Sequence, residues 1–380
     1  MNLCRKISGL LLLVTLLPAI TMAQISAPNP PALAAKGYLL LDFKSNQILA
    51  EKNAGERLDP ASITKLMTAY AVFRAIKSGQ INMEDEVLVS EKAWRTPGSR
   101  MFIEVGTRVP VEKLLPGMII QSGNDASVAL AEHVAGTEGA FAEIMNQLAA
   151  ELGMTNTNYA NSTGLPAENH YTSATDIAKL ASTLIKEFPD YYRWYSQKEF
   201  SYNGITQGNR NALLWRDESV DGMKTGYTES AGYCLVSSAE RNDMRLISVV
   251  LGTASPAARA SESSALLNYG FRFFESKLLW EAGEIIASSR IWKGAQEQID
   301  LIVKDPVYVT IPRGTAEQIE TRMEIPNRLM APVTEALPIG QVAASVNGID
   351  VAKVNLYSSI NVPEGGFMQA VWDDVLLWFE

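Results

Sequence analysis

The chain has 380 residues, of which 47% are hydrophobic and 20% are charged, a composition typical of folded globular proteins and not of disordered or collagen-like chains. Its length predicts two domains rather than one small core. With 33 basic and 42 acidic residues the net charge is −9, and no run of Lys or Arg occurs, so nucleic acid is not an expected partner. The two His and two Cys lack the spacing of metal ligands, and we expect no metal or other cofactor.

Residues 1–23 have the pattern of a secretory signal peptide. Arg5 and Lys6 precede an apolar run over residues 10–17, and Thr21-Met22-Ala23 offers small residues at the cleavage position. About eleven apolar residues are too few to span a bilayer, so we expect cleavage after Ala23 and an exported, periplasmic protein; an uncleaved anchor is the alternative. Cleavage would remove Cys4. Cys234, in an apolar strand pattern, is then interpreted as a small buried residue rather than a nucleophile.

Residues 24–282 are expected to form the first domain, with residues 24–35 as an extended leader. A hairpin is predicted from strands over 38–42 and 47–51. A helix follows, with Asp59 as its N-cap, Pro60 in its first turn and an end near Lys77. Further helices are predicted over 111–120, 126–134, 175–185 and 260–275, with Thr175-Asp176 as a possible cap, and strands over 232–239 and 244–251. This order predicts an α+β fold, an antiparallel sheet with helices packed on it.

Residues 283–364 are predicted to form a small all-β domain, since turn signals separate short apolar runs at 299–303, 307–311, 319–325, 341–346 and 351–356. Residues 365–380 read as an amphipathic helix with Gln369, Asp373 and Glu380 on its polar side. We expect residues 366–380 to lie on a membrane surface, the outer face of the inner membrane. Docking on the β domain is the alternative. The helix has no Lys or Arg, so apolar burial would have to provide the anchoring.

The first residues with chemical potential are Ser62 and Lys65, in Ser62-Ile63-Thr64-Lys65 at the start of the predicted helix. A spacing of three places both side chains on one helix face, and the N–H groups of a helix start favour negative charge beside Ser62. Burial and neighbouring cations can lower the pKa of a lysine, and a neutral amine can then activate a serine without a histidine. The tetrad alone is weak, because most such spacings are solvated helix faces.

Two further motifs strengthen the case by their order and spacing. Ser122-Gly123-Asn124 begins 60 residues after Ser62, on a predicted loop between helices, and Lys224-Thr225-Gly226 follows 102 residues later at the start of a strand region. The loop can present a hydroxyl and an amide to a cleft. Gly226 would permit close approach of a substrate to the strand edge.

The three motifs together resemble those of the penicillin-recognising serine enzymes, which have the β-lactamase and DD-peptidase fold. The resemblance is closest to the low-molecular-mass penicillin-binding proteins that act as D-alanyl-D-alanine carboxypeptidases, serine peptidase family S11. It covers nearly the whole chain. The stretches that carry it are PASITK at 60–65, IIQSGNDA at 119–126, VDGMKTGYT at 220–228 and GFRFFE at 270–275. The family also pairs a peptidase domain with a β-rich domain and a C-terminal amphipathic anchor.

The resemblance implies a reaction on peptidoglycan stem peptides, in cell-wall maturation and shape, with β-lactams as covalent inhibitors. Ser62 would attack the carbonyl between two D-alanines and Lys65 would serve as its base. Ser122, assisted by Lys224, would pass a proton to the leaving amine. Asn124 would bind the amide on the acyl side of the substrate.

Two binding elements complete the implied site. Backbone N–H groups of Ser62 and Tyr227 would form the oxyanion hole, and Tyr227 stands where some members have His or Thr. Thr225 and Arg259 would hold the terminal carboxylate; a surface arginine is the alternative interpretation of Arg259.

Other functions share part of this pattern. A class A β-lactamase has all three motifs, but here the second motif reads Ser-Gly-Asn and no Glu-x-x-Leu-Asn occurs in the middle region. DD-endopeptidase action on cross-links is chemically close and stays open. A non-catalytic peptidoglycan-binding protein would not need Ser62, Lys65 and Lys224 together. His133 in an apolar helix and His170 in a loop are interpreted as structural.

Overall fold

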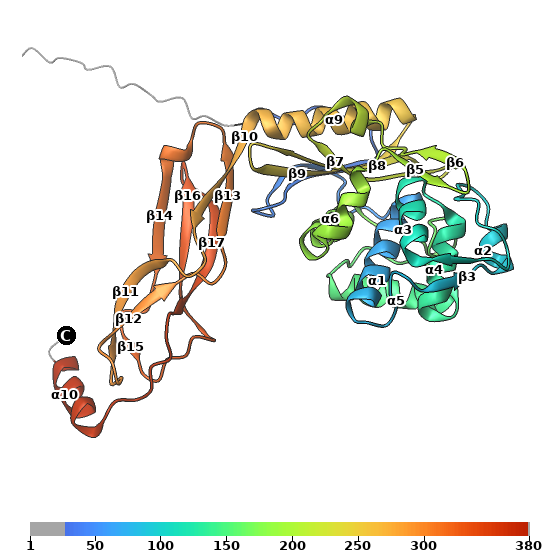
Figure 1. Cartoon of the computed structure of the whole chain (residues 1–380). Helices are drawn as coiled ribbons and strands as arrows, with labels where there is room; N and C mark the ends of the chain where they lie inside the picture. The colour runs from blue at the N-terminus through green and yellow to red at the C-terminus, as the bar shows by residue number, and fades with distance from the viewer. Residues whose placement is uncertain (1–26, 379–380) are drawn as a thin grey trace, which may run out of the picture.

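Five antiparallel strands form the sheet on which the first domain is built, in the order β2-β1-β9-β8-β7 (Figure 1). The computed structural model describes residues 27–378 of the chain; the predicted signal peptide and residues 379–380 lie outside this range. The strands are β1 (Gly37–Asp42), β2 (Ile48–Lys52), β7 (Val220–Thr228), β8 (Gly232–Arg241) and β9 (Met244–Thr253).

The sheet is covered on both faces, because side chains alternate along each strand. Along β1, Leu39 and Leu41 enter the core shared with the helices of the middle region, whereas Tyr38 and Leu40 enter the core under α9. In Figure 1, α9 lies along one face of the sheet and the remaining long helices lie on the other. The expected α+β fold with helices on an antiparallel sheet is therefore confirmed.

The helical layer holds most of the chain between β2 and β7. The longer helices of this layer are α1 (Lys65–Lys77), α3 (Val111–Ile120), α4 (Asn124–Ala135), α5 (Glu138–Glu151) and α6 (Ala174–Glu187). Helix α9 (Pro256–Phe273) lies on the opposite face of the sheet. The shorter elements of the layer are α2 (Glu91–Arg95), α7 (Pro189–Tyr192), η2 (Arg193–Ser196), β3 (Glu86–Leu88), β4 (Arg108–Pro110), β5 (Glu199–Tyr202) and β6 (Ile205–Gly208). The short helix α8 (Leu213–Arg216) packs instead into the core under α9.

Two predicted helix starts were wrong. Asp59 does not cap a helix: Pro60 stands at the N-cap of a 3₁₀ turn, η1 (Ala61–Thr64), and α1 begins only at Lys65. Helix α6 is capped by Ser173, whose hydroxyl accepts from the Asp176 N–H, and not by Thr175-Asp176. In both places several residues that can cap a helix stand next to one another in the sequence, so the sequence alone does not show which of them begins the helix.

A second, all-β domain follows α9, as predicted, but its first strand begins at Phe274, within the range expected for the first domain. Its strands are β10 (Phe274–Trp280), β11 (Ile285–Trp292), β12 (Gln298–Ile302), β13 (Val307–Pro312), β14 (Ile319–Glu324), β15 (Leu329–Met330), β16 (Pro338–Val346) and β17 (Ile349–Ser358), with a short turn η3 (Ala316–Gln318). Strand β10 pairs with β13, and the other six form one sheet with its own apolar core. The domain extends from the sheet end of the first domain as an elongated stalk in Figure 1.

Side-chain contacts tie the two domains at this junction. Ser45, in the turn between β1 and β2, lies with its Oγ 2.6 Å from Thr310 Oγ1 on β13. Arg313 donates from its guanidinium to the carbonyl oxygens of Phe271 and Phe274, where α9 passes into β10, at 2.9 Å each. The stalk is thus linked to the β1–β2 turn and to the end of α9.

The C-terminal helix α10 (Phe367–Leu377) docks on the tip of the stalk by its acidic side (Figure 1). Asp373 is only 6% exposed and accepts from the Lys293 N–H at 2.6 Å, and Asp374 pairs with Lys293 Nζ at 2.5 Å. The opposite side is left uncovered, with Met368 at 87%, Trp372 at 65% and Trp378 at 90% exposure. Among the described residues, no helix is both long and apolar enough to cross a bilayer.

Candidate active site

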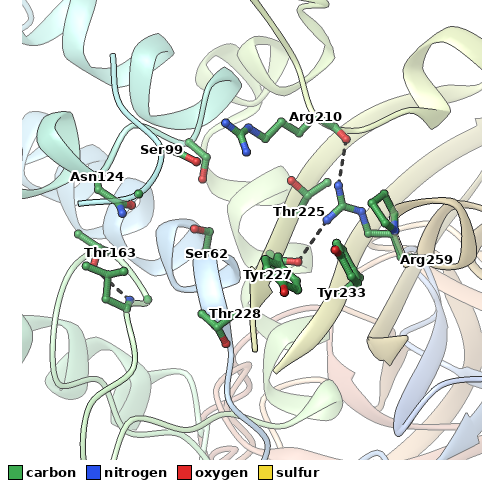
Figure 2. Close-up of a pocket in the computed structure, with 16 residues that line it drawn as sticks. Ser62, Ser99, Asn124, Thr163, Arg210, Thr225, Tyr227, Thr228, Tyr233 and Arg259 are labelled. Carbon is green, nitrogen blue, oxygen red and sulfur yellow. Dashed lines mark hydrogen bonds between the residues drawn. The ribbon is translucent and has the colours of Figure 1, made fainter. Parts of the chain in front are cut away.

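A cavity of about 520 Å³ lies between strand β7 and the helical layer (Figure 2). Its wall is made by the 3₁₀ turn η1, the loop after α2, the loop before α4, the loop around Thr163, the segment before α8, the end of β7 and the start of α9. All three sequence motifs contribute to it, through Ser62, Ser122, Asn124 and Thr225. Polypeptide segments more than 150 residues apart therefore meet at one concave surface.

Ser62 is presented by a backbone with unusual conformation. The preceding residue, Ala61, has a φ of +47°, a region that non-glycine residues rarely adopt. Gly164 and Gly226 pack against this turn: a Cβ on Gly164 would lie 1.8 Å from the Ala61 carbonyl oxygen, and one on Gly226 would lie 3.2 Å from the Ser62 nitrogen. Gly226 thus lets β7 approach the Ser62 turn itself, a use that the sequence interpretation, which gave it to the substrate, did not foresee.

Lys65 lies one turn beyond Ser62 and is only 1% exposed. Its Nζ is 3.1 Å from Ser62 Oγ and 2.6 Å from each of two acceptors, Asn124 Oδ1 and the Thr163 carbonyl oxygen. Burial lowers the pKa of Lys65 to about 7. Among the charges around it, Asp125 raises this pKa and the Arg210 guanidinium lowers it. A substantial neutral fraction at pH 7 follows.

A second lysine stands across the cavity. Lys224, on β7, donates to Ser122 Oγ at 3.0 Å and to the Thr225 carbonyl oxygen at 3.0 Å. Burial lowers the pKa of Lys224 well below its ordinary range, and the nearby Lys65 lowers it further. Ser122 itself has a φ of +68°. Both serine hydroxyls thus have a lysine amine at hydrogen-bond distance. Ser62 directly follows a residue with positive φ, and Ser122 has a positive φ itself.

Asn124 and Asp125 fix the loop that borders the cavity on the other side. Asn124 donates from Nδ2 to the Pro97 carbonyl oxygen at 2.6 Å, while its Oδ1 faces Lys65. The buried Asp125 carboxylate accepts from the N–H groups of Met101 and Phe102, at 2.9 Å each. One amide hydrogen of Asn124 is therefore committed to structure, and the second is available to the cavity.

Strand β7 supplies the remaining wall through Thr225 and Tyr227. Thr225 is 5% exposed and lines the cavity. Tyr227 is half exposed and stacks on Tyr233 of β8, with ring centroids 4.2 Å apart. This aromatic pair closes the end of the cavity at the edge of the sheet.

Arg259 lines the cavity and is not a free surface residue, but its guanidinium is directed at backbone. It donates to the carbonyl oxygens of Gly226 and Arg210, at 3.2 and 3.4 Å. Arg210, which the sequence interpretation missed, extends across the cavity toward Ser99 and forms no ion pair with any residue of 27–378 (Figure 2). Its neighbours Asn209 and Asn211 are buried and donate to the carbonyl oxygens of Gln197 and Gly222, and no sequence motif marks this arginine.

The two histidines and the cysteine lie apart from this chemistry. His170 is buried and uses both ring nitrogens, with Thr64 Oγ1 at 2.9 Å and the Ala160 N–H at 3.1 Å; burial lowers the pKa of His170 to about 4. His133 lies on α4 with Nε2 3.5 Å from an Asp85 carboxylate oxygen. Cys234 is 1% exposed, and burial raises its pKa to about 11. Within residues 27–378 no three metal-ligating side chains converge on one point.

A serine beside a buried lysine, a serine–asparagine loop and a lysine–threonine–glycine strand around one cavity define the class of penicillin-recognising serine enzymes. Comparison with known proteins narrows this class. The family model "D-alanyl-D-alanine carboxypeptidase" matches residues 24–255, and the model "Penicillin-binding protein 5, C-terminal domain" matches residues 274–364. The chain belongs to the D-alanyl-D-alanine carboxypeptidase family, peptidase S11.

Individual relatives cover both domains. The D-alanyl-D-alanine carboxypeptidase DacC of Escherichia coli is 42% identical over 92% of this chain and 89% of its own length. The crystal structure of penicillin binding protein 5 from Haemophilus influenzae aligns over 89% of this chain and all of its own, with 41% identity and a TM-score of 0.87. Penicillin-binding protein D2 from Listeria monocytogenes, in its ampicillin-bound form, aligns over 64% of this chain and 99% of its own, with 28% identity and a TM-score of 0.59.

The contact between Gly164 and the Ala61 carbonyl predicts a sharp effect of one methyl group. Gly164→Ala should displace the Ser62 turn and lower D-alanine release by roughly 10²-fold, because misplacement of reacting groups by about 1 Å has effects of this size. The matched control is Gly106→Ala, with a similar φ of +78° but nothing within 4 Å of the added Cβ. Both variants carry the same backbone strain, so equal losses of activity in the two would contradict the prediction.

Proposed function

We propose that the carboxypeptidase reaction of this family proceeds in this chain through an acyl-enzyme on Ser62. The observation that carries the proposal is the geometry around Lys65 Nζ. A neutral amine has two N–H bonds and one lone pair; the acceptors Asn124 Oδ1 and Thr163 O, at 2.6 Å each, take the two hydrogens. The lone pair is then directed at Ser62 Oγ, 3.1 Å away, where it accepts the hydroxyl proton as Oγ attacks the carbonyl between two D-alanines.

Groups around the cavity stabilise the negative charge that develops on the carbonyl oxygen and supply the proton that the leaving amine needs. The backbone N–H groups of Ser62 and Tyr227 stabilise the oxyanion of the tetrahedral intermediate. Ser122, whose Oγ is bonded to Lys224 at 3.0 Å, passes a proton to the departing amine of D-alanine, and the proton that Lys65 took from Ser62 restores the Ser122 hydroxyl. Water then hydrolyses the ester on Ser62, and the shortened stem peptide leaves.

Substrate binding uses the two ends of the cavity. The free N–H of Asn124 binds the amide on the acyl side of the scissile bond. The terminal carboxylate lies between Thr225, Arg259 and Arg210. Because Arg259 is already hydrogen-bonded to two carbonyl oxygens, Arg210 supplies the unpaired guanidinium. This cationic end suits the free carboxylate of the terminal D-alanine.

Exchange of Ser62 for alanine tests the assignment. Ser62→Ala should abolish D-alanine release from diacetyl-Lys-D-Ala-D-Ala and covalent labelling by a fluorescent penicillin, because no other group accepts the acyl chain. Ser99→Ala removes another hydroxyl of the same cavity and should leave labelling intact. Labelling would be located by mass spectrometry of the modified peptide. Labelling that survives in Ser62→Ala, or a modified peptide without residue 62, would disprove the mechanism.

The lowered pKa of Lys65 predicts the pH dependence of acylation. The amine acts as base only when neutral, so the second-order rate of penicillin labelling should be constant above about pH 7 and fall about tenfold per pH unit below it. Circular dichroism at each pH controls for unfolding. A rate that stays constant from pH 5 to pH 8 would show that Lys65 is not the base.

We also propose that the protein is exported to the periplasm and attached to the membrane surface through α10. The uncovered apolar side of this helix supports attachment, and its acidic side is already occupied by the stalk. With the helix held in place, Trp372 and Trp378 enter the lipid interface without a contribution from basic residues.

Vesicle binding distinguishes this mode from electrostatic attachment. The double variant Trp372→Ala/Trp378→Ala should lose binding to phosphatidylcholine vesicles, whereas Leu337→Ala/Ile349→Ala, at 67% and 66% exposure elsewhere on the stalk, should retain it. Anionic lipid should not strengthen binding of the unmodified protein. Equal binding by both double variants, or binding that requires anionic lipid, would contradict the proposal.

A further inference from the structure

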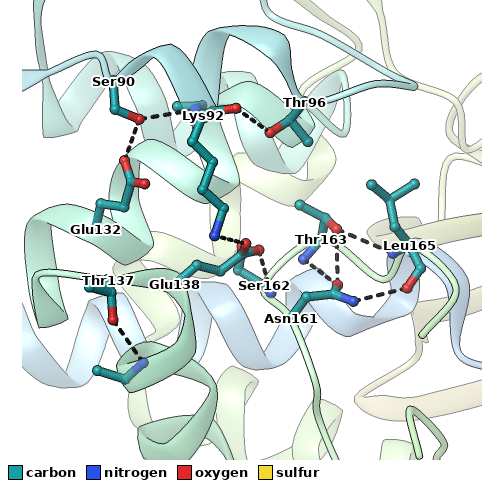
Figure 3. Close-up of polar contacts among 12 residues, drawn as sticks. Ser90, Lys92, Thr96, Glu132, Thr137, Glu138, Asn161, Ser162, Thr163 and Leu165 are labelled. Carbon is teal, nitrogen blue, oxygen red and sulfur yellow. Dashed lines mark hydrogen bonds and ion pairs between the residues drawn. The ribbon is translucent and has the colours of Figure 1, made fainter. Parts of the chain in front are cut away.

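Glu138, which lies outside the cavity, begins a series of hydrogen bonds that leads through Ser162 and Asn161 to Thr163 (Figure 3). Glu138 is the first residue of α5 and its side chain is only 12% exposed. One carboxylate oxygen pairs with Lys92 Nζ of α2 at 2.8 Å. The other accepts from Ser162, from the N–H at 3.1 Å and from the hydroxyl at 2.8 Å. The carboxylate therefore joins α2, α5 and the loop that precedes α6.

The loop continues from Ser162 to the cavity through a tight turn. Asn161 Oδ1 accepts from the Thr163 N–H at 3.1 Å and from the Gly164 N–H at 2.8 Å. This turn points the Thr163 carbonyl oxygen at Lys65 Nζ, 2.6 Å away. The buried Ser162 also holds α1, since its carbonyl oxygen accepts from the Thr68 hydroxyl at 2.6 Å. Two bonds of the Glu138 carboxylate thus fix the segment that orients the lone pair of Lys65.

The Glu138 side chain is ionised at neutral pH. Burial opposes ionisation, but hydrogen bonds from Lys92 and Ser162 outweigh it and bring the pKa of Glu138 below its ordinary value. The carboxylate lies near enough to Lys65 to raise the pKa of that amine. The other charged or titratable groups around Lys65 are Asp125 on α4, Arg210 before α8, Lys224 on β7 and His170 in the loop before α6.

We propose that Glu138 is a positioning residue for Lys65: its bonds to Ser162 hold the Thr163 carbonyl against the amine, and its ion pair with Lys92 sets the net charge that this side of the site presents. The inference rests on the proposed role of Lys65 as base. Glu138 touches neither the cavity nor Ser62, and Lys92 is more than half exposed on α2. An ion pair outside the cavity therefore acts on the base Lys65 through a loop and through its electric field.

Two variants distinguish the hydrogen bonding of Glu138 to Ser162 from the effect of its negative charge. Glu138→Gln keeps an acceptor oxygen for Ser162 and removes the negative charge, so the turn stays and the pKa of Lys65 falls. The acid limb of kcat/KM should then move to lower pH by roughly 0.5 unit, the size expected of one charge at such a distance. Glu138→Ala also removes the acceptor, and should lower kcat about tenfold or more with little change in KM.

Lys92→Gln tests the sign of the field. Removal of the positive charge leaves Glu138 uncompensated, so the pKa of Lys65 rises and the acid limb moves to higher pH, opposite to Glu138→Gln. The shift should be smaller, because Lys92 is exposed to solvent. The matched control is Glu151→Gln, at the other end of α5, whose carboxylate pairs with Arg74 at 3.6 Å. Its pH profile should coincide with that of the unmodified protein.

Profiles of D-alanine release and of penicillin labelling from pH 5 to pH 9 decide the outcome, with circular dichroism as a check of folding. Shifts of opposite sign in Glu138→Gln and Lys92→Gln support the proposal. Profiles that coincide with Glu151→Gln, or that move in the same direction in both variants, overturn it. Failure of this inference is distinguishable from failure of the proposed function, which would show as an unmodified protein that does not acylate at Ser62 or whose rate has no acid limb.

Discussion

The burial of the Lys65 amine is the constraint on which the rest of the site depends. An ammonium group without access to water is costly, and the free energy of burial appears as a pKa lowered to about 7. The protein keeps the amine in place with two carbonyl-type acceptors, one from Asn124 and one from the Thr163 backbone. Each acceptor is in turn held by a loop, through the Pro97 carbonyl on one side and Asn161 on the other. The loops around the cavity therefore orient the lone pair of the Lys65 amine.

The stalk and α10 are also held in place by a small number of specific polar contacts. A few polar bonds at the sheet edge, such as Ser45 to Thr310, connect two domains that have separate apolar cores. At the far end, Asp373 fastens α10 by a backbone N–H and leaves the aromatic side of the helix uncovered. An acidic helix is thereby fixed to the protein by its polar side. Its apolar side is free for another surface, and the distance between that surface and the cavity is set by the stalk.

Much of the architecture could be predicted because apolar residues recur with the period of the element they form. The helix over 111–120 and the five strands predicted for the second domain lie at or within a few residues of their expected bounds, whereas β10, β11 and β15 of that domain were not predicted. The predicted helix start was wrong where several neighbouring residues met the criteria for beginning a helix. Asp59, Pro60 and Ser62 all suit a helix start, and contact of Gly164 and Gly226 with the Ser62 turn selects a 3₁₀ turn there instead.

The sequence by itself determined the fold class, the three motifs and the pair Ser62 and Lys65, because periodicity and a spacing of one helical turn are local properties. Only the tertiary structure decided which partners complete the site. Glu138, the Thr163 carbonyl and Arg210 belong to no motif; they follow Lys65 by 73, 98 and 145 residues, and the fold brings each of them near its amine. Backbone carbonyls in particular are present at every residue. Their role arises only when the fold removes water and leaves one of them as the acceptor within reach of a buried amine.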